Sequence, residues 1–218
     1  MTGRDQPLSG PARDQPQSGP ARERESDRER WNRKYSSAQD SDDPPAALVS
    51  VLDMLPTSGR ALDIAGGRGT TAAVLALRGL QVTVADVSRL ALDMAVRRAG
   101  QLDVSVETVE IDLRADPPPA GPWELITVFH YLDRAIFPSL IDRLVPGGLL
   151  VVGIATRTHL QRHSRPGPGF VLDDGEILTL TPGLDMVHHR EEWDRTGRHG
   201  AVFVGRRPGL AAPATDPT

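Results

Sequence analysis

Three aspartates stand where three successive apolar runs of the chain end. Asp63 closes the first run beside a glycine-rich turn, and Asp86 and Asp112 close the second and third. Ligands of open α/β sheets bind beyond the carboxyl ends of the strands, so three carboxylates there would gather around one bound molecule. The residue types and positions therefore predict a small-molecule site that offers several hydrogen-bond acceptors.

The first run passes straight into the turn Gly66-Gly67-Arg68-Gly69, and a helix is predicted to follow. Glycines let the backbone approach a ligand closely, and the first N–H groups of a helix point at whatever lies before it. A turn that only connects a strand to a helix is the alternative interpretation. The carboxylates at the other strand ends favour ligand binding.

Each aspartate has a chemical role that fits its position. Asp86 is placed to accept hydrogen bonds from both ribose hydroxyls of an adenosine. Asp112 can accept from the adenine amino group while the backbone of Leu113 meets the ring. Asp63 would repel the phosphates of a dinucleotide and attract an ammonium group. An adenosine that carries an amino acid with an ammonium and a sulfonium therefore fits best.

A nicotinamide dinucleotide is the competing ligand. Residues 67–72 satisfy the loose G-x-G-x-x-A pattern of dinucleotide-binding loops, so an NAD-dependent oxidoreductase is an alternative function. The Asp63 carboxylate, the lack of a second substrate domain and a predicted antiparallel hairpin at the end of the chain all count against it.

Strands and helices are predicted to alternate through the middle of the chain. The strands are too continuously apolar for a sheet with one wet face, so a parallel sheet covered by helices on both faces is expected. Ser88 is expected to cap a helix that stops at Gly100. The predicted strands are 60–64, 80–85, 104–111, 124–129 and 149–154, and the predicted helices are 46–55, 69–78, 88–98 and 135–144.

The two ends of the chain differ from this core. The runs 185–193 and 199–207 have no helix between them and should pair as an antiparallel hairpin. Residues 1–25 contain a near-repeat rich in Pro, Gly, Ser and Gln, and 209–218 form an Ala/Pro/Thr tail. Neither can bury much apolar surface, so both are predicted to be disordered. One domain, 26–208, remains.

The composition excludes several kinds of chemistry. A chain of 218 residues suffices for one α/β domain, and its net charge of −4 gives no general attraction to nucleic acid or to an anionic membrane. The absence of cysteine excludes disulfides, thiolate metal sites and a cysteine nucleophile. No run approaches the roughly 18 apolar residues of a membrane helix, and the first residues are unlike a secretory signal, so a cytoplasmic protein is expected.

The motifs together resemble those of class I S-adenosylmethionine-dependent methyltransferases. Residues 62–69 are similar to the family's first motif, Asp-x-Gly-x-Gly-x-Gly, with Ala65 in place of the first glycine. Asp86-Val87 is similar to the acidic second motif, Asp112-Leu113 to the third, and Pro146-Gly147-Gly148 to the turn before the fifth strand. The resemblance extends over residues 48–207, which is most of the chain outside the tails.

This resemblance implies a fold and a cofactor. The fold would be a doubly wound, Rossmann-like α/β sheet of seven strands in the order 3-2-1-4-5-7-6, with the last strand antiparallel and helices on both faces. S-adenosylmethionine would donate a methyl group by in-line displacement. The residues implied to bind it come from the three motifs and the end of the fourth strand: Asp63, Ala65, Gly66, Gly67, Asp86, Val87, Asp112, Leu113 and Phe129.

Two further segments resemble, more narrowly, the small methyltransferases related to tellurite-resistance and thiopurine-methylating proteins. Trp31 and Tyr35 lie four apart, on one face of a helix, and can dock over a ligand or serve as a packing anchor. His130 and Tyr131 follow the fourth strand, where the resemblance implies groups that face the methyl donor and acceptor. The alternative is that Tyr131 packs and His130 caps the next helix.

Residues 157–169 form a basic loop rich in Pro and Gly, which is predicted to border the acceptor pocket. His159 and His163 lie four apart in it, but no nearby carboxylate or third ligand supports a metal site, and none is predicted.

The sequence therefore predicts a methyltransferase that uses S-adenosylmethionine and methylates a small-molecule acceptor. An oxidoreductase and a non-catalytic module that binds the cofactor are the alternatives. Catalysis is expected mainly from holding the acceptor in line with the methyl group, with His130 as the one candidate base. Nucleic acid and membranes are not expected as partners.

Overall fold

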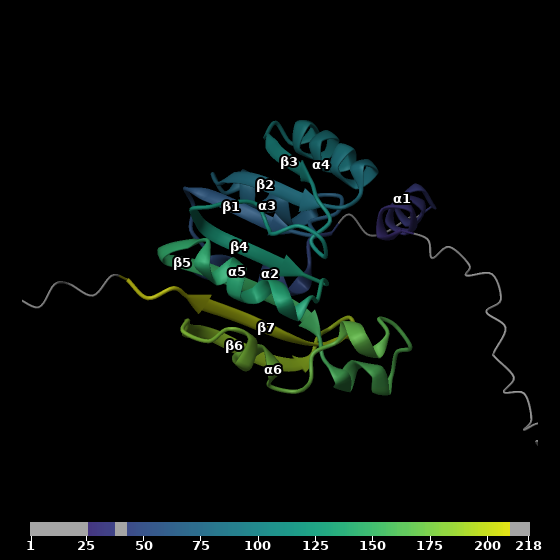
Figure 1. Cartoon of the computed structure of the whole chain (residues 1–218), viewed down its shortest axis with the longest axis vertical. Helices are drawn as coiled ribbons and strands as arrows, with labels where there is room; N and C mark the ends of the chain where they lie inside the picture. The colour runs from purple at the N-terminus through teal and green to yellow at the C-terminus, as the bar shows by residue number, and fades with distance from the viewer. Residues whose placement is uncertain (1–25, 38–42, 210–218) are drawn as a thin grey trace, which may run out of the picture.

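The chain folds around one seven-stranded sheet (Figure 1). The computed structural model describes residues 26–37 and 43–209. The predicted disorder of residues 1–25 and of most of the C-terminal tail lies outside this range. The strands are β1 (Arg60–Ile64), β2 (Gln81–Asp86), β3 (Val106–Glu110), β4 (Trp123–Phe129), β5 (Leu144–Ala155), β6 (Asp185–Trp193) and β7 (His199–Arg206).

The strand order is β3-β2-β1-β4-β5-β7-β6. Strands β1 to β5 pair in parallel, whereas β7 runs antiparallel to both β5 and β6. The predicted fold class, strand order and terminal hairpin are confirmed. The carboxyl ends of the parallel strands consequently share one edge of the sheet, the right-hand edge in Figure 1.

Among the described residues, no helix is both long enough and apolar enough to cross a bilayer.

Helices connect the strands and cover the sheet. The helices are α1 (Asp27–Ser37), α2 (Ala46–Val51), α3 (Thr70–Leu77), α4 (Arg89–Gln101), α5 (Phe137–Asp142) and α6 (Glu176–Leu180), with 3₁₀ turns η1 (Leu52–Met54), η2 (Arg134–Ile136), η3 (Arg157–Gln161) and η4 (Pro168–Phe170).

The core has two halves because successive side chains of a strand point to opposite faces of the sheet. On one face Leu62 of β1 belongs to a cluster with Phe137 of α5. On the other face Ala61 belongs to a cluster with Leu48 of α2 and Leu75 of α3. All five residues are fully buried. Both faces are therefore dry, as the continuous apolar strands predict.

Several element boundaries differ from the predicted ones around α5 and β5. The helix predicted over 135–144 begins as the 3₁₀ turn η2 and ends at Asp142, because Leu144 already pairs with Trp123. The predicted turn 146–148 lies inside β5, where the register shifts between Trp123 and Leu125. The predicted turn is thus an irregular segment inside a longer strand. Strand β3 is shorter than the predicted 104–111.

The predicted stop of α4 at Gly100 is also wrong, since the helix continues to Gln101. The residue with the left-handed conformation after the helix is Asp103, at φ 56°. Gly100 has no such φ, and a Cβ built on it meets no atom within 4 Å.

Replacing Gly100 by alanine is therefore expected to stabilise the protein by roughly 0.5–1 kcal/mol, because alanine loses less backbone entropy in a helix. Thermal unfolding of Gly100→Ala against the wild type measures the effect. A melting temperature at or below that of the wild type would contradict the open surroundings of this residue.

Candidate active site

The glycine turn bends back over the carboxyl end of β1. Ala65 and Gly67 adopt left-handed φ values of 50° and 54°, and the N–H of Gly66 donates to the carbonyl of Ala85 on β2 at 3.2 Å. Ala65 occupies a conformation that costs a residue with a Cβ about 1–2 kcal/mol. This cost explains why glycine is the expected residue there and why alanine, with the smallest side chain, still fits.

Asp63 lies fully buried beneath this turn. Its Oδ1 accepts a hydrogen bond from the Thr127 hydroxyl at 2.8 Å, while no described residue donates one to its Oδ2. Burial raises the pKa of Asp63 to about 7; the nearby Asp86 raises it further, and the Thr127 hydrogen bond opposes the change. A buried oxygen without a donor is costly, and a cationic donor such as an ammonium would relieve the cost.

Asp86 is held in place at the end of β2 by the backbone. Its Oδ2 accepts from the N–H of Gly67 and its Oδ1 from the N–H of Ser88, both at 2.9 Å. Burial raises its pKa, and these N–H donors oppose the rise. Ser88 caps α4 as predicted, accepting from Ala91 N at 3.2 Å. Each carboxylate oxygen keeps a further lone pair, so Asp86 can still accept from a hydroxyl of a ligand. Val87 lies half-buried between Asp86 and Ser88.

The other predicted cofactor residues lie in different surroundings. Asp112 is half-buried in the turn after β3, where its Oδ1 accepts from Arg114 N at 3.0 Å. Leu113 is buried in the core. Phe129 is buried in the half of the core that contains α2 and packs so closely on Gly153 that a Cβ there would lie 2.5 Å from its ring.

His130 lies at the end of β4 in a left-handed conformation, with φ 59°. Its N–H donates to the carbonyl of Gly153 at 2.9 Å. The residue reaches solvent, but partial burial of its ring lowers the pKa of the imidazole. The cations Arg198 and Lys34 lower this pKa further, whereas Asp194 raises it. His130 is thus a neutral imidazole near pH 7. A positive φ at a residue other than glycine is often found at functional sites.

Tyr131 is partly buried against the core. Burial, with Asp133 and other carboxylates, raises its pKa to about 12, so the phenol keeps its proton. The alternative that His130 caps the next helix is wrong, because Asp133 accepts from Ala135 N at 3.0 Å and caps η2.

Helix α1 lies beyond the carboxyl ends of the strands (Figure 1), and its side chain Tyr35 reaches the glycine turn. Trp31 and Tyr35 stack with ring centroids 5.8 Å apart. The Tyr35 hydroxyl lies 2.5 Å from where a Cβ on Gly67 would stand. Asn32 accepts from the Ser88 hydroxyl at 2.6 Å. Of the two side chains predicted to cover a ligand, Tyr35 therefore lies on the predicted cofactor loop, and Trp31 stacks on Tyr35.

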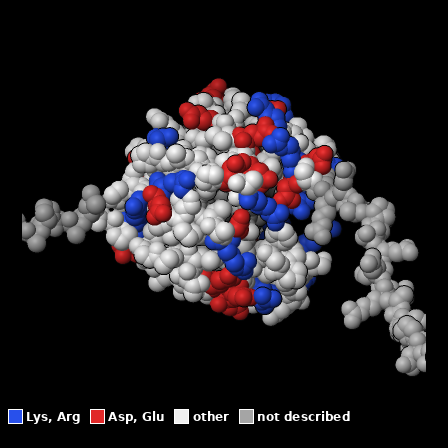
Figure 2. Space-filling model, in the orientation of Figure 1, with Lys and Arg blue, Asp and Glu red and all other residues white. Residues whose placement is uncertain are grey.

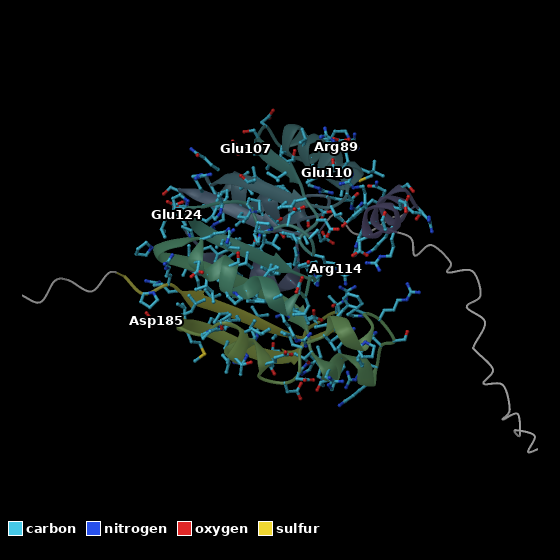
Figure 3. All side chains as sticks on the ribbon, viewed as in Figure 1. Arg89, Glu107, Glu110, Arg114, Glu124 and Asp185 are labelled. Carbon is cyan, nitrogen blue, oxygen red and sulfur yellow. The ribbon has the colours of Figure 1, made fainter. Side chains whose placement is uncertain are left out.

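Two ion pairs join α1 to the same edge. Arg28 pairs with Glu110 at 3.1 Å, and Asp27 pairs with Arg114 at 2.8 Å. Figure 3 labels Glu110 and Arg114 at the edge of the sheet that faces α1. None of the eleven residues of α1, all within the described part of the chain, is buried. Polar contacts thus hold the helix in this position.

A histidine network joins the basic loop after β5 to the turn between β6 and β7. The buried His159 accepts from His199 N at its Nδ1, at 3.2 Å, and its Nε2 lies 3.0 Å from the Arg165 carbonyl. One nitrogen accepts and the other donates, so His159 is neutral, and burial lowers its pKa accordingly. His163 stacks on it at 4.3 Å, and its Nε2 lies 2.8 Å from the Gly197 carbonyl.

Sequence reasoning missed this link. The spacing of His159 and His163 placed them close together, but their partners lie further along the chain: His199 bonds to His159, and the Gly197 carbonyl bonds to His163. Within the described ranges, no group of three or more His, Cys, Asp or Glu residues could hold a metal ion.

Two surface hollows lie away from this arrangement. One is lined by Met54, Glu124 and Arg206, at the amino ends of β4 and β5, and the other by Arg157, Leu160 and Asp174 beside η3.

Comparisons with known proteins agree with this topology. Residues 61–148 match the family model described as a methyltransferase domain. A curated relative, the protein-L-isoaspartate O-methyltransferase of Xanthomonas axonopodis pv. citri, is 34% identical over 125 residues, which cover 56% of this chain and 54% of the relative. The chain spans about half the length of the curated relatives it matches.

Two solved structures share the fold. NodS from Bradyrhizobium japonicum, an N-methyltransferase in complex with S-adenosyl-L-homocysteine, has a TM-score of 0.58 at 23% identity, covering 74% of this chain and 83% of NodS. TehB from Haemophilus influenzae has a TM-score of 0.61 at 15% identity, covering 83% of this chain and 66% of TehB. The fold is therefore the Rossmann-like methyltransferase fold. The narrower likeness to tellurite-resistance proteins is supported only in part.

Proposed function

We propose that the protein is an S-adenosylmethionine-dependent methyltransferase that methylates a small-molecule acceptor. The observation that carries the proposal is the buried Asp63 Oδ2, which lacks a donor among the described residues directly beneath the glycine turn. An ammonium group supplies the missing hydrogen bond and the opposite charge, whereas a phosphate would be repelled. The match of residues 61–148 to a methyltransferase domain supports the same cofactor.

The residues present fit this cofactor at each of its parts. Asp63 would hold the ammonium, Asp86 the ribose hydroxyls, and Asp112 the adenine amino group. When bound, S-adenosylmethionine supplies a methyl group on a positively charged sulfur, which an electron pair of the acceptor can displace. Asp86 is already oriented by two N–H donors, so little reorganisation is needed to bind the ribose.

The elements around the strand ends have supporting roles. His130, a neutral imidazole at the end of β4, can take a proton from an acceptor that must lose one. Tyr131 keeps its proton and can donate a hydrogen bond. Trp31 and Tyr35 would lie over the bound cofactor and exclude water, provided that Tyr35 moves off Gly67 when the cofactor enters.

Equilibrium binding of S-adenosylhomocysteine tests the cofactor assignment. Calorimetry should show binding to the wild type, loss of affinity in Asp112→Ala and no change in the matched control Asp53→Ala, whose side chain is exposed on η1. Asp112 is half-buried, so this variant leaves the buried aspartates intact. Binding of NADH in place of S-adenosylhomocysteine would favour the oxidoreductase and refute the proposal.

Catalysis needs a separate measurement, because a non-catalytic module would also bind the cofactor. Transfer of labelled methyl from S-adenosylmethionine into the small-molecule fraction of a cell extract is expected. Label found only in protein or RNA would contradict a small-molecule acceptor.

A further inference from the structure

Thr127 of β4 is the strand neighbour of Asp63. The parallel pairing of β1 with β4 sets the two residues opposite each other, so their side chains point to the same face of the sheet. Thr127 is fully buried and Asp63 is 1% exposed. On the other side of Asp63, β2 contributes Val84, whose side chain has no hydrogen-bonding group. Of the two flanking side chains, only Thr127 can therefore hydrogen-bond to the carboxylate, and its hydroxyl donates to Oδ1 at 2.8 Å.

This hydrogen bond fixes the direction of the second carboxylate oxygen. The two oxygens diverge from one carbon, so a contact that holds Oδ1 also determines where Oδ2 points. Oδ2 points into the glycine turn, since a Cβ built on Gly66 would stand only 2.5 Å from it. No described residue donates a hydrogen bond to Oδ2. Thr127 thus presents the free oxygen of Asp63 to the place where a ligand would meet the turn.

The Thr127 hydroxyl can hold the Asp63 carboxyl in both of its protonation states, because a hydroxyl both donates and accepts. It donates to Oδ1 when Asp63 is ionised. When Asp63 is protonated, an Oδ1–H can donate to the Thr127 Oγ1, and the hydroxyl proton can turn to the Leu62 carbonyl, which lies 3.5 Å away. The orientation of Asp63 is therefore kept before and after an ammonium binds.

The charges around Asp63 do not replace this contact. Acidic and basic side chains are interspersed over the face of the molecule in Figure 2, so this face offers no field of one sign. The titratable groups of the elements that meet at the turn are Asp86 of β2, Arg68 of the turn itself, Tyr35 of α1 and His130 after β4. Burial raises the pKa of Asp63 most, the Thr127 hydrogen bond lowers it, and Asp86 raises it. Of these influences, only the hydroxyl favours the ionised carboxylate.

We infer that Thr127 is a positioning residue for the cofactor: its hydroxyl aims the Asp63 Oδ2 at the ammonium and stabilises the ionised form that pairs with it. The inference rests on the proposed function, because it requires an ammonium group at the glycine turn. A hydrogen bond to a charged oxygen is about twice as strong as one between neutral groups. A carboxylate that is already oriented needs no rearrangement when the ligand arrives, so less binding free energy is lost on ordering it.

The pH dependence of cofactor binding tests this role. Affinity for S-adenosylhomocysteine is measured by calorimetry from about pH 6 to about pH 8.5 in the wild type and in Thr127→Val, which replaces the hydroxyl by a methyl group of similar size. The wild-type affinity should rise as Asp63 ionises. In Thr127→Val the rise should move to higher pH by about one unit, and affinity at pH 7 should fall about tenfold. A side chain that only packs would not move the pH at which affinity rises.

Three further variants separate the hydroxyl from the packing, and thermal unfolding checks that each one is folded. Thr127→Ser keeps the hydroxyl and should restore the wild-type pH dependence. Thr127→Ala removes the hydroxyl without placing a methyl group against Asp63, so it takes the place of the valine variant if that variant does not fold. Thr83→Val is the matched control and should bind as the wild type does. Thr83 is a buried threonine of β2, and its hydroxyl donates to another carboxylate, Glu107, at 3.2 Å.

The outcomes separate this inference from the proposed function. If the wild type binds S-adenosylhomocysteine and the loss of the Thr127 hydroxyl leaves the pH dependence unchanged, the role of Thr127 is overturned and the proposed function stands. An equal shift in Thr83→Val also overturns that role, because the effect would then not belong to this contact. If the wild type does not bind S-adenosylhomocysteine at any pH, the proposed function is refuted, and the inference with it.

Discussion

Asp63→Asn is expected to weaken S-adenosylhomocysteine binding about a hundredfold or more at pH 7.5, and to stabilise the free protein at the same pH. Removing one partner of a buried charge pair typically costs about 2–5 kcal/mol of binding. Asparagine keeps the acceptor for the Thr127 hydroxyl, so the local packing is retained. Calorimetric titration and thermal unfolding measure the two effects.

The stability gain follows from the pKa of Asp63. That pKa is about 7 in the folded protein, whereas the ordinary value for an aspartate is 3.8. At a pH between these two values, Asp63 is protonated in the folded state and ionised in the unfolded state. The free energy of unfolding of the wild type should therefore fall as pH rises from about 4 to about 7, by on the order of 4 kcal/mol. An asparagine side chain cannot ionise, so this contribution to the pH dependence should vanish in Asp63→Asn.

Binding should show the opposite pH dependence. Asp63 must lose its proton to pair with an ammonium, so wild-type affinity for S-adenosylhomocysteine should increase as pH rises from about 6 to about 7. Asp53→Asn, on the surface, serves as the matched control and should behave as the wild type in both assays. Wild-type affinity in Asp63→Asn would rule out the role of Asp63 in holding the ammonium.

Gly66→Ala should destabilise the fold by about 1–3 kcal/mol and abolish cofactor binding. Its backbone φ is ordinary, so the obstacle is space: a Cβ at Gly66 would lie 2.5 Å from Asp63 Oδ2 and 2.7 Å from Val84 Cγ1. Val84 is fully buried in the core and cannot move away without a repacking cost. Urea denaturation measures the loss.

Gly100→Ala is the control for this prediction, since the same substitution in open space should have the opposite sign. A midpoint for Gly66→Ala equal to that of the wild type would show that Asp63 is free to move. The buried aspartate would then be less constrained than its contacts indicate.

The fold was predictable where local pattern and global topology agree. Continuous apolar strands separated by glycine and proline indicated a covered parallel sheet, and the helix-free spacing of 185–193 and 199–207 indicated the hairpin. The end of α4 was not predictable, because Gly100 has the usual signature of a helix stop while Asp103 takes the left-handed conformation. The irregular segment 146–148 depends on the pairing of β5 with β4, which a local stretch of sequence does not show.

The positions of the candidate site residues in the fold were predictable, but their hydrogen bonds were not. The position of Asp63 and Asp86 at neighbouring strand ends followed from the strand pattern. Thr127 lies 64 residues from Asp63 in the chain, and its hydroxyl donates to Oδ1. Oδ2 is left without a donor among the described residues, and sequence alone could not show this. The contact of Tyr35 with Gly67 likewise depends on where α1 docks. The mixed charge of the α1 sequence indicated only that the helix is exposed.

The docking of α1 has a kinetic consequence. Ion pairs and a hydrogen bond, rather than buried apolar side chains, hold this helix over the glycine turn. Salt screens exposed ion pairs, whereas apolar packing is insensitive to it or is strengthened by it. Ionic strength should therefore control how long a nucleoside stays in the site, with faster exchange at high salt.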